Sequence, residues 1–442
     1  MPPIELSLVP AHFDYFKTDR LLNGDLVIKT PHGLSPLNRL LIEGAADSKA
    51  KNALGLMLPD ALPLLAFSLL HAPAVTTLPE HPVEVVQPVA EIPTALPDET
   101  TEGAEPVAPP EVFLSGCPAT YYHHDLFHVE MARETARKNH CNTLLGLCAA
   151  DLPEQTDAPE LILFAFGNNT ETALVCEVLR QAHARLAPGG KLLAAVQKTN
   201  DTWLRNQLEK TFGNLTLARK EKFGLLYSVK KKNAPVNAAE RFCREIEINF
   251  GGESLPFESS YGIFSNAGLD NGSRALLEVL EPPTPCESLL DLGCGWGALG
   301  VLASKSLTLK RLTMIDANAR AVDMAQRNAK RYVSGPDVQV RLECDAESIL
   351  YEGAPEEVGA YDLVISNPPY ATEFRVIEMF LRAAHRALRL GGTVWFVTKT
   401  NPLLEQRMKD QFGNLNILSR RGYSIFTAKK TTHKPKIHAE GR

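Results

Sequence analysis

The C-terminal half of the chain alternates short apolar runs with longer stretches in which apolar residues recur at helical spacing. The apolar runs predict strands at residues 289–292, 311–315, 338–342, 363–365 and 393–398. The amphipathic stretches between them predict helices at residues 298–305, 319–332 and 373–389. Because strands that alternate with helices are typical of a parallel, doubly wound α/β sheet, this is the predicted fold.

Two features near the end of this pattern predict how the sheet is completed. The pair Gly391-Gly392 follows the third helix and is expected to end it, as glycine C-caps do. A further helix precedes two short apolar runs at 415–418 and 423–428, which flank Arg420-Arg421-Gly422. These runs predict an antiparallel hairpin on the edge of the sheet.

Several motifs of the first half recur in the second half in the same order. The matching segments are residues 181–190 with 383–392, Val129-Glu-Met-Ala132 with Val322-Asp-Met-Ala325, Lys198-Thr-Asn200 with Lys399-Thr-Asn401, and Phe212-Gly-Asn-Leu215 with Phe412-Gly-Asn-Leu415. Their offset stays between about 190 and 202 residues, which is typical of an internal repeat. We therefore predict two tandem copies of one fold, residues 1–232 and 233–442.

The net charge of −6 is concentrated in one segment of the 442-residue chain. Residues 79–110 contain seven carboxylates, eight prolines and no Lys or Arg, so the rest of the chain carries about one positive charge. This composition predicts a mobile surface insertion in the first half, since it offers little apolar surface to bury. Basic clusters at 230–232, 429–430 and 434–436 fit either solvated strand ends and a basic tail or a surface for an anionic partner.

The remaining composition indicates a cytoplasmic protein without a metal. The eight cysteines are scattered and include no CxxC pair, which argues for a reducing compartment and against a zinc site or a disulfide framework. The most apolar stretch, residues 56–75, contains Asp60 and three prolines, so no membrane span is expected. The first residues show no basic region followed by an apolar stretch, so no secretory signal is expected.

The motif Asn367-Pro368-Pro369-Tyr370 closes the predicted strand at 363–365. Because proline fixes φ and donates no hydrogen bond, two consecutive prolines make a rigid turn with outward carbonyls. The Asn367 side-chain oxygen and the Pro368 carbonyl would then form a pair of acceptors beside the ring of Tyr370. Such an arrangement suits a planar ring that bears an exocyclic amino group, although a tight loop after a strand is the simpler interpretation of an Asn-Pro pair alone.

Polar residues also follow the neighbouring strands. Asp291-Leu-Gly293-Cys-Gly295-Trp-Gly297 is a glycine turn between a strand and a helix, where the backbone can approach a ligand. Asp316 ends the next strand and Asp345 the one after it, followed by Ala317 and Ala346, respectively. Each Asp alone is also typical of a helix N-cap or turn. Together the three strand ends predict a nucleoside site in which Asp316 accepts hydrogen bonds from ribose hydroxyls and Asp345 from an adenine amino group.

These motifs together resemble the class I S-adenosylmethionine-dependent methyltransferases that act on exocyclic or amide nitrogens. The segment Gly262-Ile-Phe264-Ser265-Asn-Ala-Gly-Leu269-Asp270-Asn-Gly272-Ser273 resembles more specifically the bacterial ribosomal RNA guanine-N2 methyltransferases, which also have two tandem halves. The resemblance covers residues 245–430 strongly and 110–230 through the repeat. The first hundred residues and the acidic insertion depart from it.

The resemblance implies a set of site residues. The implied catalytic residues are Asn367, Pro368, Pro369 and Tyr370, and the implied cofactor-binding residues are Phe264, Asp291, Gly293, Gly295, Gly297, Asp316, Ala317, Asp345, Ala346 and Asn367. Asn367 and the Pro368 carbonyl would hold the target amino group, and Tyr370 would stack on the base. Phe264 would line the methionine end of the cofactor or pack in the core, and Asp270 and Ser273 are expected to cap a helix.

The implied activity is methyl transfer from S-adenosylmethionine to the exocyclic N2 of a guanine in ribosomal RNA or a ribosomal subunit, by a monomer. Two alternatives stay open. Methyltransferases of protein glutamine amides and of DNA adenine N6 share the Asn-Pro-Pro-Tyr motif, and a non-catalytic RNA-binding or ribosome-assembly factor could keep the fold. Loss of cofactor-site residues would be expected of such a factor, and the second half has lost none.

The first half lacks the motifs of the second. The repeat places Ala165-Phe166-Gly167-Asn168 opposite the Asn-Pro-Pro-Tyr motif and His123 opposite Asp316, and no glycine turn precedes it. The first half is therefore expected to keep the fold without a cofactor site or catalytic residues. It could bind RNA, assist folding of the second half, or bury a shared interface.

Overall fold

The computed structural model describes the two repeated halves and the hairpin between them. The described residues are 17–21, 26–30, 33–71, 116–153, 157–167, 170–231, 242–344, 346, 355–369, 374–399 and 402–432. Several predicted features lie outside the described residues: the insertion at 79–110, the boundary between 232 and 233, Asn168, Asp345, Tyr370, Thr400-Asn401 and the lysines of 434–436.

Each half contains a seven-stranded sheet of the same topology, which confirms the predicted duplication. The C-terminal sheet has the order β14 (Asp337–Leu342), β13 (Arg311–Asp316), β12 (Ser288–Leu292), β15 (Tyr361–Ser366), β16 (Leu388–Thr398), β18 (Tyr423–Lys429), β17 (Asn416–Arg420). The N-terminal sheet has the order β5 (Leu144–Cys148), β4 (Ala119–His123), β3 (Ala53–Leu56), β6 (Leu161–Phe166), β7 (Lys191–Val196), β9 (Gly224–Lys230), β8 (Thr216–Glu221). In both, the first five strands are parallel and the last two form the predicted antiparallel edge hairpin.

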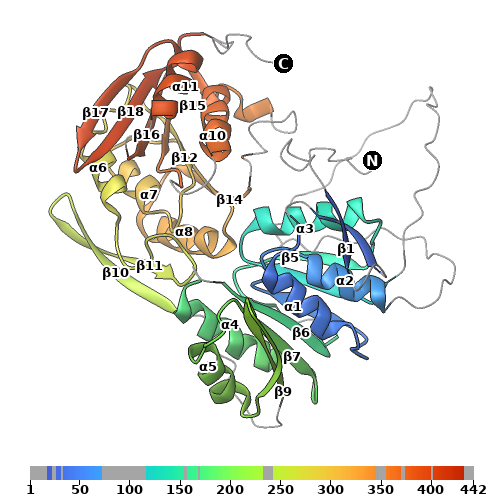
Figure 1. Cartoon of the computed structure of the whole chain (residues 1–442). Helices are drawn as coiled ribbons and strands as arrows, with labels where there is room; N and C mark the ends of the chain where they lie inside the picture. The colour runs from blue at the N-terminus through green and yellow to red at the C-terminus, as the bar shows by residue number, and fades with distance from the viewer. Residues whose placement is uncertain are drawn as a thin grey trace, which may run out of the picture.

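Helices cover both faces of each sheet, as expected for a doubly wound fold. In the C-terminal half α6 (Asn271–Val279), α7 (Ala298–Ser304) and α8 (Ala319–Tyr332) pack on one face, and α10 (Phe374–Ala387) and α11 (Pro402–Phe412) on the other. In the N-terminal half α1 (Pro36–Ala45), α2 (Leu62–Leu70) and α3 (Leu126–Lys138) pack on one face, and α4 (Thr172–Arg185) and α5 (Trp203–Phe212) on the other. The two halves are the yellow-to-red and blue-to-green parts of Figure 1.

The strand register agrees with the sequence alignment of the two halves. The last paired residues at the carboxyl edge are Leu56 with Tyr122 and Phe164, and Leu292 with Ile315 and Ser366. One residue further on, His123 therefore corresponds to Asp316 and Ala165 to Asn367. β6 continues as a strand through Phe166, whereas β15 ends at Ser366 because the two prolines that follow Asn367 donate no ladder hydrogen bonds.

The predicted end of the third helix is wrong. Helix α10 ends at Ala387, and Gly391 and Gly392 lie inside strand β16 rather than at a C-cap. Gly391 has φ +86°, and the Gly392 carbonyl accepts a hydrogen bond from the Lys430 N–H, so the glycine pair forms an irregularity in a paired strand. A Cβ on Gly392 would come within 3.0 Å of two strand carbonyls, which explains why glycine is needed there.

Two hairpins were not predicted. Strands β1 (Lys17–Leu21) and β2 (Leu26–Thr30) form one, and β10 (Cys243–Phe250) and β11 (Glu253–Ser260) form the other. The second hairpin precedes α6 and lies to one side of both sheets in Figure 1. Phe257 of β11 packs on Trp296 and Tyr332, so the hairpin is anchored on the helical layer beside the glycine turn.

Candidate active site

The glycine turn and Asp316 meet at the carboxyl edge of the C-terminal sheet. Gly293 and Gly295 have φ values of +73° and +57°, in the left-handed region that favours glycine. The N–H of Gly293 donates to the Ile315 carbonyl at 2.9 Å, and the N–H of Gly295 donates to Asp316 Oδ2 at 2.8 Å. The turn that follows β12 is therefore fixed against the end of β13.

Asp316 is held by two backbone donors and is not a helix N-cap. Its Oδ1 accepts from the Asn318 N–H at 2.8 Å, and Asn318 itself caps α8 by accepting from the N–H groups of Arg320 and Ala321. Burial raises the pKa of Asp316 to about 6, although its backbone donors lower it. The carboxylate thus has a fixed orientation at the sheet edge, which is the arrangement that a ribose diol requires.

Asp291 lies below the glycine turn rather than at its surface. Its side chain is fully buried, and burial raises its pKa to about 7, with a further rise from the charge of Asp316. A Cβ on Gly300 of α7 would stand 2.9 Å from Asp291 Oδ2, so this helix approaches the carboxyl group closely. Asp291 is therefore packed against α7, the helix that follows the glycine turn.

Asn367 has a side-chain amide whose orientation is set by two acceptors. Its Nδ2 donates to Asp270 Oδ1 and to Ser273 Oγ, both at 3.0 Å. The nitrogen end of the amide is therefore directed at α6, and the oxygen Oδ1 is its acceptor end. Pro368 is buried and Pro369 is exposed.

The capping prediction for Asp270 is confirmed. Asp270 is the N-cap of α6, and its Oδ1 accepts from the N–H groups of Gly272 and Ser273 at 2.8 and 3.1 Å. The predicted cap role of Ser273 is wrong, since Ser273 lies in the first turn and its hydroxyl contacts Asn367 instead. The start of α6 and the turn after β15 therefore form one hydrogen-bonded unit.

The other predicted site residues lie around this edge. The core-packing interpretation of Phe264 is wrong, because 66% of its surface is exposed. Ala346 is buried with φ +49°. The Ala317 carbonyl accepts a hydrogen bond from the N–H of Leu126, which belongs to the other half of the chain.

The N-terminal half contacts the site through a reciprocal backbone pairing that sequence reasoning missed. The N–H of Leu126 donates to the Ala317 carbonyl at 2.8 Å, and the N–H of Ala319 donates to the His124 carbonyl at 2.7 Å. The bridge joins Asp125 with Asn318, which are the N-caps of α3 and α8. Since these residues correspond in the repeat, the two halves meet by equivalent loops. The sequence carries one signal of this contact, because a residue able to cap a helix, Asp125 or Asn318, stands at the same position in each copy.

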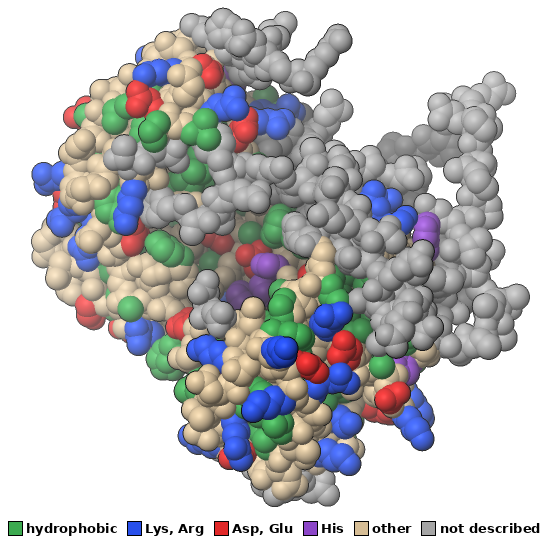
Figure 2. Space-filling view, viewed as in Figure 1, with side chains coloured by type: hydrophobic (Ala, Val, Ile, Leu, Met, Phe, Trp, Pro, Cys, Tyr) green, Lys and Arg blue, Asp and Glu red, His purple; other side chains and the backbone are tan. Residues whose placement is uncertain are grey.

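The place of Asp316 is taken in the N-terminal half by a cluster of histidines. His123 stacks on His124 with ring centroids 4.6 Å apart and lies 4.3 Å from His128. Burial lowers the pKa of His124 to about 3 and that of His123 well below its usual value, so both rings are neutral. Histidine side chains gather in the hollow between the halves (Figure 2). A neutral imidazole cannot replace a carboxylate that accepts from two hydroxyls.

Within the described ranges, no group of His, Cys, Asp and Glu side chains could hold a metal ion. None of the helices that the structure describes is long and apolar enough to cross a membrane.

The structure defines a protein with two halves of the same α/β fold, and in the second half a glycine turn and Asp316 meet at the carboxyl edge of the sheet. Residues 254–427 match the family model of the methyltransferase small domain. The matched residues lie within the C-terminal half.

Curated relatives match the same part of the chain. The uncharacterized protein YbxB of Bacillus subtilis (strain 168) is 26% identical over 182 residues, which cover 40% of this chain and 87% of that protein. Ribosomal RNA small subunit methyltransferase C of Escherichia coli (strain K12) is 30% identical over 209 residues, which cover 46% of this chain and 56% of that protein. The aligned region thus spans just over half the length of that relative.

A solved structure matches both halves. The T. thermophilus 16S rRNA N2 G1207 methyltransferase, solved in complex with AdoMet and guanosine, has a TM-score of 0.66 and 19% sequence identity. The match covers 95% of this chain and 99% of that chain. The tandem fold is therefore the same in the two proteins.

Proposed function

We propose that this chain transfers a methyl group from S-adenosylmethionine to the exocyclic N2 of a guanine in ribosomal RNA. The observation that carries the proposal is the orientation of Asn367, whose amide nitrogen is engaged by Asp270 and Ser273. In the proposal, Asn367 Oδ1 and the Pro368 carbonyl are the two acceptors that recognition of an amino group requires.

The cofactor edge fits S-adenosylmethionine. Asp316 would accept from the ribose hydroxyls, and Gly293 and Gly295 would let the backbone approach the methionine part, while Asp345 would accept from the adenine amino group. When bound, the cofactor supplies a methyl group on a sulfonium, which is a good leaving group. Phe264, exposed in the segment before α6, is the predicted contact for the methionine end.

The acceptor turn would orient the target nitrogen for in-line displacement. Asn367 Oδ1 and the Pro368 carbonyl accept the two hydrogens of the amino group, which turns the nitrogen lone pair toward the methyl carbon. The N–C bond forms as the C–S bond breaks, its electron pair stays on sulfur, and one proton leaves the nitrogen for water. Positioning is the main contribution of the protein to such a step.

Ribosomal RNA is favoured as the substrate by the names of the relatives and by the two-half architecture. A relative named ribosomal RNA small subunit methyltransferase C matches the C-terminal domain, and a 16S rRNA N2 G1207 methyltransferase shares the tandem fold. A guanine amino group inside a duplex cannot reach such a site, so the target base is single-stranded or flipped out. We propose a monomer that acts in the cytoplasm on ribosomal RNA or on a ribosomal subunit.

The substrate class is tested by incubating the protein with labelled S-adenosylmethionine and, separately, naked ribosomal RNA, ribosomal subunits, DNA and protein. We expect label in RNA, either free or within a subunit. Label that enters only protein glutamine or DNA adenine would support the alternatives that share the Asn-Pro-Pro-Tyr motif. Absence of transfer to every acceptor would favour a non-catalytic assembly factor.

A further inference from the structure

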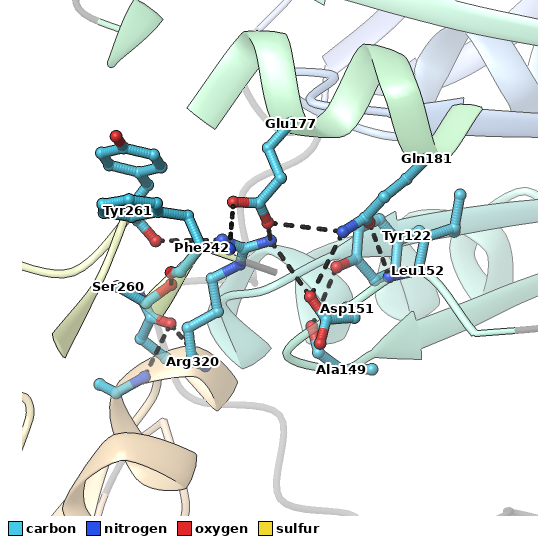
Figure 3. A network of polar contacts seen from close by, with 12 residues as sticks. Tyr122, Ala149, Asp151, Leu152, Glu177, Gln181, Phe242, Ser260, Tyr261 and Arg320 are labelled. Carbon is cyan, nitrogen blue, oxygen red and sulfur yellow. Dashed lines mark hydrogen bonds and ion pairs between the residues drawn. The ribbon is translucent and has the colours of Figure 1, made fainter. Parts of the chain in front are cut away.

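A buried carboxylate of the N-terminal half forms an ion pair with an arginine of the C-terminal half. Glu177 of α4 is fully buried, and its Oε1 lies 2.5 Å from Nη2 of Arg320, whose side chain is 1% exposed. The same guanidinium donates to the Tyr261 carbonyl at 3.2 Å and lies 3.6 Å from Asp151 (Figure 3). Gln181 Nε2 also donates to Oε1 of Glu177 at 3.4 Å, and the Phe242 N–H donates to its Oε2 at 3.3 Å, so both oxygens of the carboxylate are held.

This ion pair fixes the far end of the loop that carries Asp316. Arg320 lies in the first turn of α8, four residues after Asp316 and two after the N-cap Asn318. The Asn318 side chain donates to the Gly262 carbonyl at 2.7 Å. The loop is therefore held at one end by Gly295 and at the other by the N-terminal half.

A second carboxylate, at the start of the same helix, binds the segment that leads to the partners of Asn367. Glu171 occupies the N-cap position of α4, but its side chain makes no cap hydrogen bond to its own helix. It accepts instead from the Gly262 N–H at 2.8 Å and from Asn266 Nδ2 at 3.0 Å. The segment that it holds runs directly to Asp270, which contacts Asn367.

Stability alone gives little reason for this arrangement. Two charges buried together lose much of their hydration, and an apolar pair of similar size often stabilises a fold as well. An N-cap side chain that leaves its own helix uncapped also forgoes a local stabilising contact. Both features are expected where geometry at a distant point matters more than local stability.

We propose that Glu177 and Glu171 are positioning residues, through which the half without a cofactor site sets the geometry of the active half. Glu177 acts through Arg320 on the Asp316 loop and hence on cofactor binding. Glu171 acts through the 262–270 segment on Asp270 and Asn367, and hence on the target amino group. The assignment rests on the proposed function, because it names what each loop binds.

The test compares Glu177→Gln and Glu171→Gln in the full chain. Calorimetry of S-adenosylmethionine binding without RNA should show affinity weakened roughly tenfold by Glu177→Gln, since the coupling acts between two sites. Glu171→Gln should keep the wild-type affinity and lower kcat by about tenfold or more, because a misplaced acceptor costs rate. The melting temperature is measured for each variant, and assays are run well below it.

The matched control is Glu357→Gln in the C-terminal half. Glu357 is also fully buried and pairs with Arg311 and Arg341, but these contacts lie within one half and away from the interface. This variant should lower the melting temperature without changing cofactor affinity. If the three variants lower only the melting temperature, the carboxylates are merely structural and the proposal is wrong.

A double-variant cycle separates the ion pair from general damage. Arg320→Gln should weaken cofactor binding as much as Glu177→Gln does, and the double variant should show no additional loss. Additive losses would contradict action through the pair. Should Glu177→Gln not fold, Arg320→Lys carries the same test, since it keeps the charge and loses the fork geometry. A wild-type chain that binds no S-adenosylmethionine would overturn the proposed function itself rather than this coupling.

Discussion

At the scale of single residues, Asn367 shows how much of the site depends on the direction of one amide. The sequence predicts an acceptor at this position because of the two prolines that follow it. The direction of the amide is set by Asp270 and Ser273, because its nitrogen donates to both side chains. These two residues lie about a hundred residues earlier in the chain. That pairing could not be predicted, because it depends on how α6 packs beside β15.

Replacing Asn367 with Ala removes the acceptor oxygen and is expected to lower kcat by about 100-fold, as loss of one preorganised polar group does in other active sites. Cofactor affinity should change much less than kcat, because Asp316 and the glycine turn are unchanged. Rapid-quench assays with labelled cofactor measure the rate. The control is Asn249→Ala, an exposed position on β10. Wild-type turnover of the Asn367 variant would refute the acceptor role.

Asp316 gives the site a predictable pH dependence. Its raised pKa of about 6 means that the folded chain without cofactor binds this proton more tightly than the unfolded chain. Asp316 therefore contributes stability that is fully present below its ordinary pKa of 3.8 and is lost as the pH rises through about 6. In the proposed site, ribose hydroxyls would donate to the ionised carboxylate, so cofactor binding should favour the higher pH.

We expect the affinity for S-adenosylmethionine to be about tenfold lower at pH 5 than at pH 8, since a group with this pKa is mostly protonated at the lower pH. Asp125 has a pKa of about 6, raised by burial, and its charge acts on Asp316, so it broadens the transition. Calorimetric titration at several pH values measures the effect. Asp316→Asn should bind weakly with a flatter profile, and equal wild-type affinities at pH 5 and 8 would exclude the role.

At the scale of elements, prediction succeeded where local signals agreed with packing. Helix α8 has the predicted bounds because apolar spacing and the N-cap Asn318 agree. The end of α10 was wrong because Gly391 and Gly392 resemble a C-cap in sequence, whereas pairing with β15 and β18 draws them into a strand. The β10–β11 hairpin was missed because its burial depends on α8 and Trp296, which are distant in sequence.

Gly391→Ala tests the strand assignment of the glycine pair. Its φ of +86° is unfavourable for a residue with a Cβ, so the free energy of unfolding should fall by about 1–2 kcal/mol. Gly268→Ala is the control, since a Cβ there meets nothing within 4 Å and the backbone is not left-handed. Urea denaturation measures both. If Gly391→Ala is as stable as the wild type, position 391 does not require a left-handed backbone, and the prediction is wrong.

At the scale of the whole molecule, the duplication was predictable and the way the halves meet was not. The repeated motifs predicted two copies of one fold and the correspondence of His123 with Asp316. The strand register agrees with this correspondence. The interface joins Asp125 with Asn318 and Glu177 with Arg320, and each pair combines residues from different copies. Sequence periodicity within one copy carries no information on such contacts.

The most direct test of the account is the identity of the methylated nucleoside. Ribosomal RNA or subunits are incubated with the protein and S-adenosylmethionine carrying a deuterated methyl group, and the RNA is digested to nucleosides and analysed by mass spectrometry. The account predicts deuterated N2-methylguanosine with the wild-type chain and about 100-fold less of it in the same initial-rate period with Asn367→Ala. A deuterated methyl group found only on another nucleoside, or found equally with the variant, would contradict it.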